Sequence, residues 1–163
     1  RILALQEALP EDHHVRVAEA DIEQLRARRP ELVDACAVLV ESPLPATWNH
    51  GDLHPWNLFG TDDRVAFFDL GDGTWSSAVE ILSVPYGSIT DRGEIAWTDV
   101  LPAWQEVWQV DDATLAEAWR ASGFTHAVNR AVTWYHALQS ASLEETVEWG
   151  HAVRVHLTSM LDV

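Results

Sequence analysis

The sequence contains no lysine, and its ten Lys or Arg positions are all arginine. Against them stand 26 Asp and Glu residues, which gives a formal net charge of -16. Proteins that bind nucleic acid neutralise its phosphates with clustered positive charge. A chain this acidic is poorly suited to that task, so we expect no nucleic-acid partner.

Cysteine is almost as scarce, since Cys36 is the only one. A single cysteine excludes an internal disulfide and favours a reducing compartment, so we expect a cytoplasmic protein. Apolar neighbours at Val33, Ala37 and Val40 predict that Cys36 is a small buried residue. No window approaches the run of about 18 apolar residues that spans a bilayer, and we recognise no signal peptide, so we expect no membrane partner.

Glycine first appears at Gly51, so no earlier segment can form a glycine-rich phosphate-binding loop. The chain begins at Arg1 rather than at Met, and we expect it to be a fragment or a processed product. Its 163 residues, 47% of them hydrophobic, are enough for a single domain, residues 1–163, with a core of its own.

Apolar periodicity predicts helices in the first part of the chain. They cover residues 2–9, 17–29 and 31–40, with breaks at Pro10 and Pro30. From residue 94 onward the pattern is again helical, and Asp111-Asp112 is a good N-terminal helix cap.

The middle of the chain predicts β structure. Short apolar runs at residues 57–60 and 65–70 flank a polar turn, which is typical of a β-hairpin. Residues 47–49 form at most a very short strand, and residues 76–84 are predicted to be helical. The expected fold class is therefore mainly α with a small β-hairpin.

Nine tryptophans are unusual for a chain of this length. Several recur at helical spacing, among them Trp97, Trp104 and Trp108. Such stripes are more typical of packing surfaces than of aromatic ligand platforms, so we assign most of the tryptophans to the core.

The loop His-Gly-Asp-Leu-His-Pro-Trp-Asn, residues 50–57, concentrates polar chemistry. Phosphoryl transfer needs a carboxylate near the acceptor hydroxyl and hard oxygen ligands for metal ions that bridge the nucleotide phosphates. In kinase-like enzymes the carboxylate and a metal-binding Asn lie five residues apart, and a metal-binding Asp follows across a hairpin at an Asp-x-Gly turn. Asp52 and Asn57 have this spacing, and Asp69 follows the predicted hairpin in Asp-Leu-Gly. The combination predicts a catalytic loop and metal-binding hairpin over residues 48–72.

The segments HGDLHPWN and FFDLGD resemble the aminoglycoside phosphotransferase and choline kinase-like family, whose members are relatives of the protein kinases. The family's loop typically reads HGDLHPGN, so this chain departs from it at Trp56, which we expect to pack beneath the loop. The resemblance is sharp over residues 48–82. It implies the C-terminal, mainly helical lobe of a protein-kinase-like α+β fold, and transfer of the γ-phosphate of ATP or GTP to the hydroxyl of a small molecule, with Mg²⁺.

The resemblance also implies roles for the three residues of the spaced motif. Asp52 would be the catalytic base or the group that orients the hydroxyl. Asn57 and Asp69 would bind Mg²⁺ and, through it, the nucleotide.

Further residues near the motif receive supporting roles from the resemblance. His50 would hold the loop in shape, and Glu80 would support it from below. His54 matches the motif and is assigned to loop support with a less defined role. Asp72 would lie near the metals or the substrate, and Trp75 would either line the acceptor pocket or pack in the core.

The family fold includes an N-terminal β lobe, which covers the nucleotide and supplies a Lys that pairs with the phosphates. This chain has no Lys and no strand-rich segment before residue 47. We therefore expect the C-terminal lobe alone, with the N-terminal β-lobe absent and catalysis feeble in isolation. Its partners would be the missing lobe and a small hydroxylated acceptor, which the acidic charge slightly favours as an amine.

Other interpretations of the loop stay open. His50, Asp52 and His54 alternate along an extended segment and can present three ligands to Zn²⁺, as in a metal-dependent hydrolase, but this leaves Asn57 and Asp69 unexplained. Asp and Asn also close ordinary turns, so a purely structural loop is a further alternative. The last alternative is a non-catalytic scaffold domain that kept the kinase lobe. The three intact motif residues argue against it.

Overall fold

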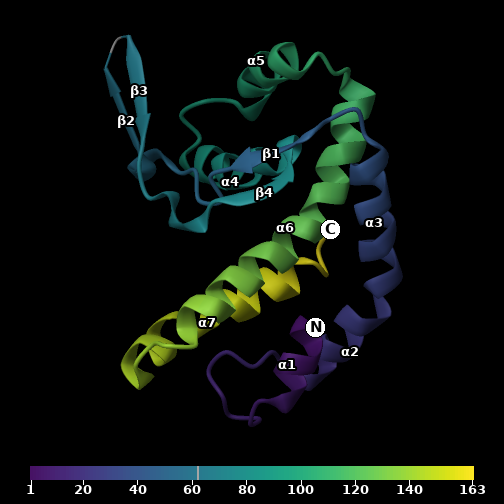
Figure 1. Cartoon of the computed structure of the whole chain (residues 1–163), viewed down its shortest axis with the longest axis vertical. Coiled ribbons are helices and arrows are strands. Elements are labelled where there is room, and N and C mark those ends of the chain that lie inside the picture. Colours follow the sequence, from purple (N-terminus) through teal and green to yellow (C-terminus); the bar gives the residue numbers. More distant parts are fainter. Residues whose placement is uncertain (62) are drawn as a thin grey trace. The chain divides into compact units, whose positions relative to one another are not determined.

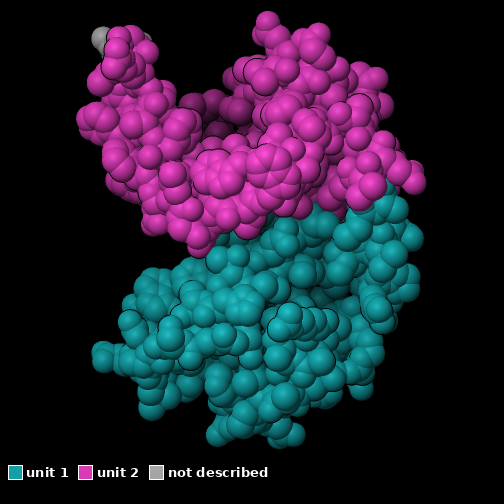
Figure 2. Space-filling model, viewed as in Figure 1, with its two compact units in different colours: residues 1–37, 123–163 teal, residues 38–122 magenta. Residues whose placement is uncertain are grey.

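The computed structural model describes residues 1–61 and 63–163 and is mainly helical. The chain divides into two compact units, residues 1–37 with 123–163 and residues 38–122 (Figure 2). The boundaries fall within helices α3 (Arg29–Glu41) and α6 (Asp112–Leu138), so both helices contribute residues to both units. The single domain expected for residues 1–163 stays a prediction.

In the unit formed by the two ends of the chain, the regular elements are helices (Figure 1). It contains α1 (Ile2–Ala8), α2 (Glu19–Ala27), the first part of α3, the second part of α6 and α7 (Leu143–Ser159). Helix α7 begins at a capping box, in which Ser142 Oγ accepts from the Glu145 N–H and the Glu145 carboxylate accepts from the Ser142 N–H. The stacked rings of Trp134 and Trp149, with centroids 5.9 Å apart, join α6 to α7.

The helices predicted at the start of the chain are confirmed, with boundaries shifted by up to two residues. The break between α2 and α3 falls at Arg28 rather than at Pro30. Pro30 lies in the first turn of α3, where a missing N–H costs nothing because helix starts leave these groups unpaired. Within the described part of the chain, no helix combines the length and the apolar character that crossing a membrane requires.

The prediction that Cys36 is buried is wrong, because its side chain is exposed. Its apolar neighbours Val33 and Val40 are exposed as well, Val40 at 85%. These residues share one face of α3 through their spacing of three and four, whereas Ala35 lies on the buried face. The apolar stripe was therefore real, but it faces outward.

The second unit carries the strands. Strands β1 (Ala46–Asn49) and β4 (Thr74–Ser77) pair antiparallel, with Trp48 opposite Trp75. Strands β2 (Leu58–Thr61) and β3 (Arg64–Phe67) form the predicted hairpin, which is confirmed. The remaining elements are the 3-10 helices η1 (Pro55–Asn57), η2 (Leu70–Asp72) and η3 (Ala78–Leu82), followed by α4 (Ser83–Arg92) and α5 (Trp97–Trp108).

The prediction of a helix over residues 76–84 is wrong at its start. Ser76 and Ser77 belong to β4, where they lie opposite Thr47 and Ala46 of β1. Helical structure begins at Ala78, first as η3 and then as α4. Pairing with a strand far away in the sequence overrides the local apolar pattern here, since β structure depends on its neighbours more than helices do.

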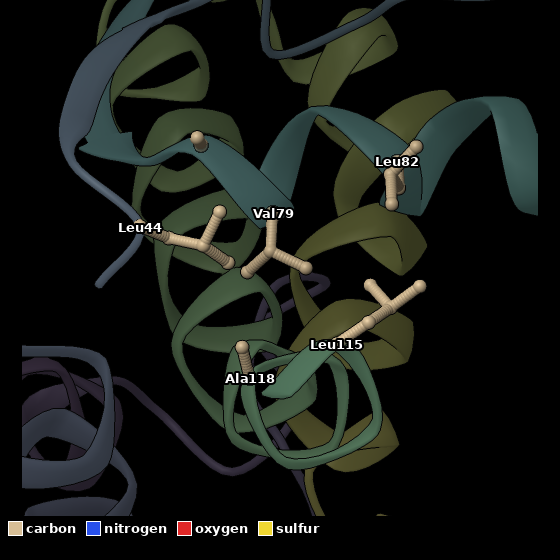
Figure 3. Close-up of a cluster of buried hydrophobic side chains, with 6 residues drawn as sticks. Leu44, Val79, Leu82, Leu115 and Ala118 are labelled. Carbon is tan, nitrogen blue, oxygen red and sulfur yellow. The ribbon is translucent and has the colours of Figure 1, made fainter. Parts of the chain in front are cut away.

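A buried cluster in the second unit anchors the strands to the helices. Figure 3 shows Leu44, Val79 and Leu82 converging on Leu115 and Ala118 of α6. Partly buried tryptophans pack against this cluster, namely Trp97, Trp104, Trp108 and Trp119. Their assignment to packing is confirmed. Because η3 contributes to the cluster and contacts β1, the strand that leads into the polar loop rests on this core.

A largely buried histidine lies in the first unit. The pKa of His126 on α6 is lowered from 6.5 to about 4, chiefly because burial disfavours the charged imidazolium. The positive charges of Arg130 and His156 lower it further. Between these two pH values the unfolded chain binds a proton that the folded chain does not.

We therefore expect the free energy of unfolding to fall as the pH drops from about 6.5 to about 4. The loss from this one group should approach about 3 kcal/mol at the lower pH. Urea unfolding of His126→Gln at pH 7 and pH 5 should show a smaller difference than the parent shows. The matched control is His136→Gln, an exposed histidine on the same helix, which should keep the parent's pH dependence. If the free energy of unfolding of His126→Gln depended on pH as strongly as that of the parent, the role given to His126 would be contradicted.

Candidate active site

Strand β1 delivers the polar loop, and Asn49 at its end fixes the strand to β4. The Asn49 side chain is buried, and its Nδ2 donates to the Ser76 hydroxyl at 2.8 Å and to the carbonyls of Ser76 and Ser77 at 3.2 Å. Two bonds to the backbone of the partner strand hold the start of the loop more firmly than strand pairing alone. Residue 50 therefore enters the loop from a fixed position.

His50 ties the start of the loop to the end of the hairpin. It is buried, and its Nδ1 accepts from the Asp52 N–H at 3.4 Å. Its Nε2 therefore carries the proton and donates to the Phe68 carbonyl at 2.6 Å. Phe68 directly precedes Asp69, so His50 connects the segment of Asp52 to the segment of Asp69, in keeping with a loop-support role.

Gly51 allows the loop to run directly against the Asp69–Asp72 turn. Its φ of +79° lies in the left-handed region, which favours glycine. A Cβ at this position would meet the Asp72 carbonyl oxygen at 2.1 Å. Only glycine lets the two backbones approach this closely, and Asp72 is thereby held beside the loop.

Asn57 closes the loop onto Asp52. Its Nδ2 donates to the Asp52 carbonyl at 2.9 Å, and its own carbonyl accepts from the Phe68 N–H at 2.9 Å. With the Asn57 NH₂ group engaged in this way, its Oδ1 is the atom left to act as a ligand. Phe68 is bonded to both His50 and Asn57, so both ends of the loop are tied to the residue before Asp69.

His54 stands inside the loop. Its Nδ1 accepts from the Trp56 N–H at 3.2 Å and thereby caps η1, whose first residue is Pro55. Its Nε2 lies 3.4 Å from Asp52 Oδ2 and 3.3 Å from Asn57 Nδ2. The imidazole therefore contacts the side chains of both the predicted base and the predicted metal ligand.

Asp69 adopts a left-handed backbone conformation, with φ 52° and ψ 65°. In the described part of the chain, Gln109 is the only other residue besides glycine with positive φ. Such a conformation costs about 1 kcal/mol or more and is found most often at functional sites. The Asp69 side chain is exposed and makes no capping hydrogen bond to η2, which leaves a carboxylate at the predicted metal position.

Two tryptophans and a glutamate lie on the elements that adjoin the loop. The Trp48 ring packs against Gly73, where a Cβ would lie 2.7 Å from the indole. Trp75, opposite Trp48 in the sheet, is 74% exposed, so its alternative assignment to core packing is wrong. Glu80 is buried in η3, the element that contacts β1, which suits support from below.

The chain's similarity to known proteins bears directly on this geometry. Residues 2–80 match the model of the phosphotransferase enzyme family, and the match includes the whole loop and the Asp69 turn. This stretch of the chain is similar to that family. The resemblance to aminoglycoside phosphotransferases and choline kinase-like enzymes is thus confirmed. No curated protein and no solved structure gives a significant match to the chain.

Trp56 is the point at which the loop departs from the usual phosphotransferase motif, and its predicted packing beneath the loop is wrong. The side chain is 80% exposed. Instead of burying the ring, the structure places the Arg92 guanidinium over it, 5.3 Å from its centroid. An exposed cation–π contact of this kind contributes about 0.5–1 kcal/mol. It joins the loop to the last turn of α4.

The geometry of the loop does not support a zinc hydrolase site. Both ring nitrogens of His50 are bonded to backbone groups, so His50 has no free lone pair for a metal. Among residues 1–61 and 63–163, no group of three or more His, Cys, Asp and Glu side chains is arranged to hold a metal ion. A pocket of about 270 Å³ does occur in the first unit, but it contains none of the predicted site residues.

The structure adds three residues to those predicted for the phosphotransferase site, namely Gly51, Asn49 and Arg92. Gly51 had a signal in the sequence, because a glycine between two polar site residues suggests positive φ or a close backbone contact. No sequence signal pointed to Asn49 or Arg92, because their contacts depend on the pairing of β1 with β4 and on the course of α4.

Proposed function

We propose that this chain is the acceptor- and metal-binding lobe of a small-molecule kinase with a protein-kinase-like fold. The complete enzyme would transfer the γ-phosphate of ATP or GTP to a substrate hydroxyl. The observation that carries the proposal is the hydrogen bond from Asn57 Nδ2 to the Asp52 carbonyl, in a loop whose two ends are tied to Phe68. This network holds the backbone of the proposed base, one proposed metal ligand and the residue before the other.

In the proposed reaction, Asp52 accepts a hydrogen bond from the acceptor hydroxyl and orients its oxygen toward the γ-phosphorus. A bond forms between that oxygen and phosphorus, and the bond from phosphorus to the β–γ bridging oxygen breaks. The nucleoside diphosphate leaves with the electron pair, and the hydroxyl proton passes to the Asp52 carboxylate. Positioning and electrostatics supply most of the rate in phosphoryl transfer, so a rigid loop is the protein's main contribution.

The donor atoms at the site fit Mg²⁺. This ion prefers oxygen ligands and keeps few protein contacts when it also binds phosphates. Asn57 Oδ1 and the Asp69 carboxylate would supply two such ligands, and the NH₂ group of Asn57 is already turned to the Asp52 carbonyl. When bound, Mg²⁺ neutralises charge on the nucleotide phosphates.

The charge of the chain supports a cationic acceptor. Three carboxylates, Asp52, Asp69 and Asp72, lie on the loop and the adjoining turn, in a chain of net charge -16. An amine-bearing acceptor would be attracted to them. Trp75 exposes an aromatic face one strand residue after Thr74 and is the proposed wall of the acceptor pocket.

The hairpin supports a partner lobe within the same protein. Phe59, Val65, Phe67 and Phe68 are each more than half exposed on β2, β3 and the residue that follows. A two-stranded hairpin is marginal by itself, and a surface this apolar is usually covered. We infer that the N-terminal lobe of the complete protein covers it, with the nucleotide between.

The test is phosphate transfer from γ-labelled ATP or GTP to a panel of hydroxylated amines, with Mg²⁺. The complete protein should label an acceptor, and chelation of the metal should abolish the labelling. Residues 1–163 alone should transfer phosphate only weakly. Robust turnover by residues 1–163 would refute the single-lobe proposal. Absence of transfer by a folded complete protein with both nucleotides would refute the kinase assignment.

A further inference from the structure

The tautomer of the neutral His54 imidazole follows from its neighbours. Nδ1 accepts a hydrogen bond from the Trp56 N–H, so in the neutral imidazole the proton lies on Nε2. The opposite tautomer would direct an Nδ1–H at the Trp56 N–H and a lone pair at the Asp52 carboxylate. Both contacts would be repulsive. In this tautomer the 3.3 Å contact between Nε2 and Asn57 Nδ2 joins two donors, and it is the one of these contacts that the opposite tautomer would favour.

The protonated Nε2 therefore brings a partial positive charge close to Asp52, whose Oδ2 lies 3.4 Å away. The two side chains are 28% and 29% exposed, so the contact is only partly open to water. Hydrogen bonds of catalytic groups are often long before substrate binds and shorten afterwards. An interaction with Oδ2 restrains rotation of the carboxylate.

We propose that His54 is a positioning residue that holds the Asp52 carboxylate through its Nε2–H. The proposal rests on the proposed function, in which Asp52 is the base. His54 then has two roles, one for each ring nitrogen. Nδ1 caps the turn at Trp56, and Nε2 orients the base. Catalytic groups need to be held to within about 0.5 Å, and a carboxylate on a loop needs a second residue to do so.

The two jobs can be separated by a pair of variants. In His54→Gln the side-chain NH₂ reaches the position of Nε2 and keeps the donor, but the acceptor at Nδ1 is lost. In His54→Asn the Oδ1 takes the position of Nδ1 and keeps the cap, but the donor toward Asp52 is lost. Each variant is therefore the control for the other.

In the complete protein, kcat of His54→Asn should fall about 10- to 100-fold, with KM for the acceptor changed far less. His54→Gln should retain kcat within about threefold to tenfold of the parent. Thermal unfolding should rank the two in the opposite order, because the Asn variant keeps the cap. A kcat that follows thermal stability instead, with Asn retained and Gln lost, would overturn the proposal.

A second measurement does not depend on catalysis. Nitrogen NMR of ¹⁵N-histidine-labelled protein, above neutral pH, should show His54 with its proton on Nε2. Asp52→Asn should shift the Nε2 resonance of His54 and leave that of the exposed His136 unchanged. A proton on Nδ1, or no shift, would overturn the proposal. The protein could show the proton on Nε2 and the shift in Asp52→Asn and yet transfer no phosphate. That result would refute the base role of Asp52 but support the contact between His54 and Asp52.

Discussion

Replacement of Asp52 by Asn should lower kcat of the complete protein by about 10²- to 10⁴-fold, the range in which general base catalysis contributes. Asn cannot accept the hydroxyl proton, and it can direct an NH₂ group where the hydroxyl must approach. The backbone carbonyl of Asp52, which accepts from Asn57 Nδ2 and from the His54 N–H, is unchanged by the substitution. The effect should therefore fall on the chemistry and not on the fold.

Steady-state kinetics and thermal unfolding of Asp52→Asn, measured side by side, test this expectation. The matched control is Asp63→Asn in the hairpin turn, where the carboxylate is exposed and accepts from the Thr61 hydroxyl. Asn retains that acceptor, so Asp63→Asn should behave as the parent does. If Asp52→Asn retained the parent's function, the chain would be the scaffold domain of the alternative interpretation rather than part of a kinase.

The motif could be predicted because its parts are local in sequence. Asp52 and Asn57 lie five residues apart, and the hairpin that precedes Asp69 has a turn of its own. Short-range spacing of this kind survives folding, so the hydrogen bond between Asn57 and the Asp52 carbonyl closes a loop already visible in the residue order. The roles of these residues stay predictions until they are tested by substitution.

The environment of the motif could not be predicted, because it depends on partners far apart in the chain. Ser76 belongs to a strand only because β1 lies beside it. Its partner in β1, Thr47, is 29 positions earlier in the chain. Trp56 is exposed, and its cation–π partner Arg92 lies far along the chain at the end of α4. Cys36 is exposed because the apolar stripe of α3 faces away from the packed side, which periodicity alone does not reveal.

Replacement of Gly51 by Ala should lower the free energy of unfolding by about 2–4 kcal/mol. One part of this cost is backbone strain, since φ is +79° and an L-residue tolerates such a value poorly. The other part is steric, since the new Cβ would meet the Asp72 carbonyl oxygen at 2.1 Å. Relief of that contact requires the loop and the Asp69–Asp72 turn to separate. Because misplacement by about 1 Å can cost about 10²-fold in rate, catalysis should suffer even in the folded fraction.

Gly93→Ala separates the two parts of this cost. Gly93 has a similar φ of +65°, but a Cβ there would meet nothing within 4 Å. Its replacement should cost only the strain, about 1 kcal/mol, and leave kcat unchanged. Urea unfolding of both variants, together with kcat, gives the steric term as the difference between them. Equal costs at the two glycines would show that the close approach of Gly51 to Asp72 is not needed. A larger cost at Gly51, with loss of kcat confined to that variant, would mean that contact between loop and turn sets the distance from the base to the metal ligands.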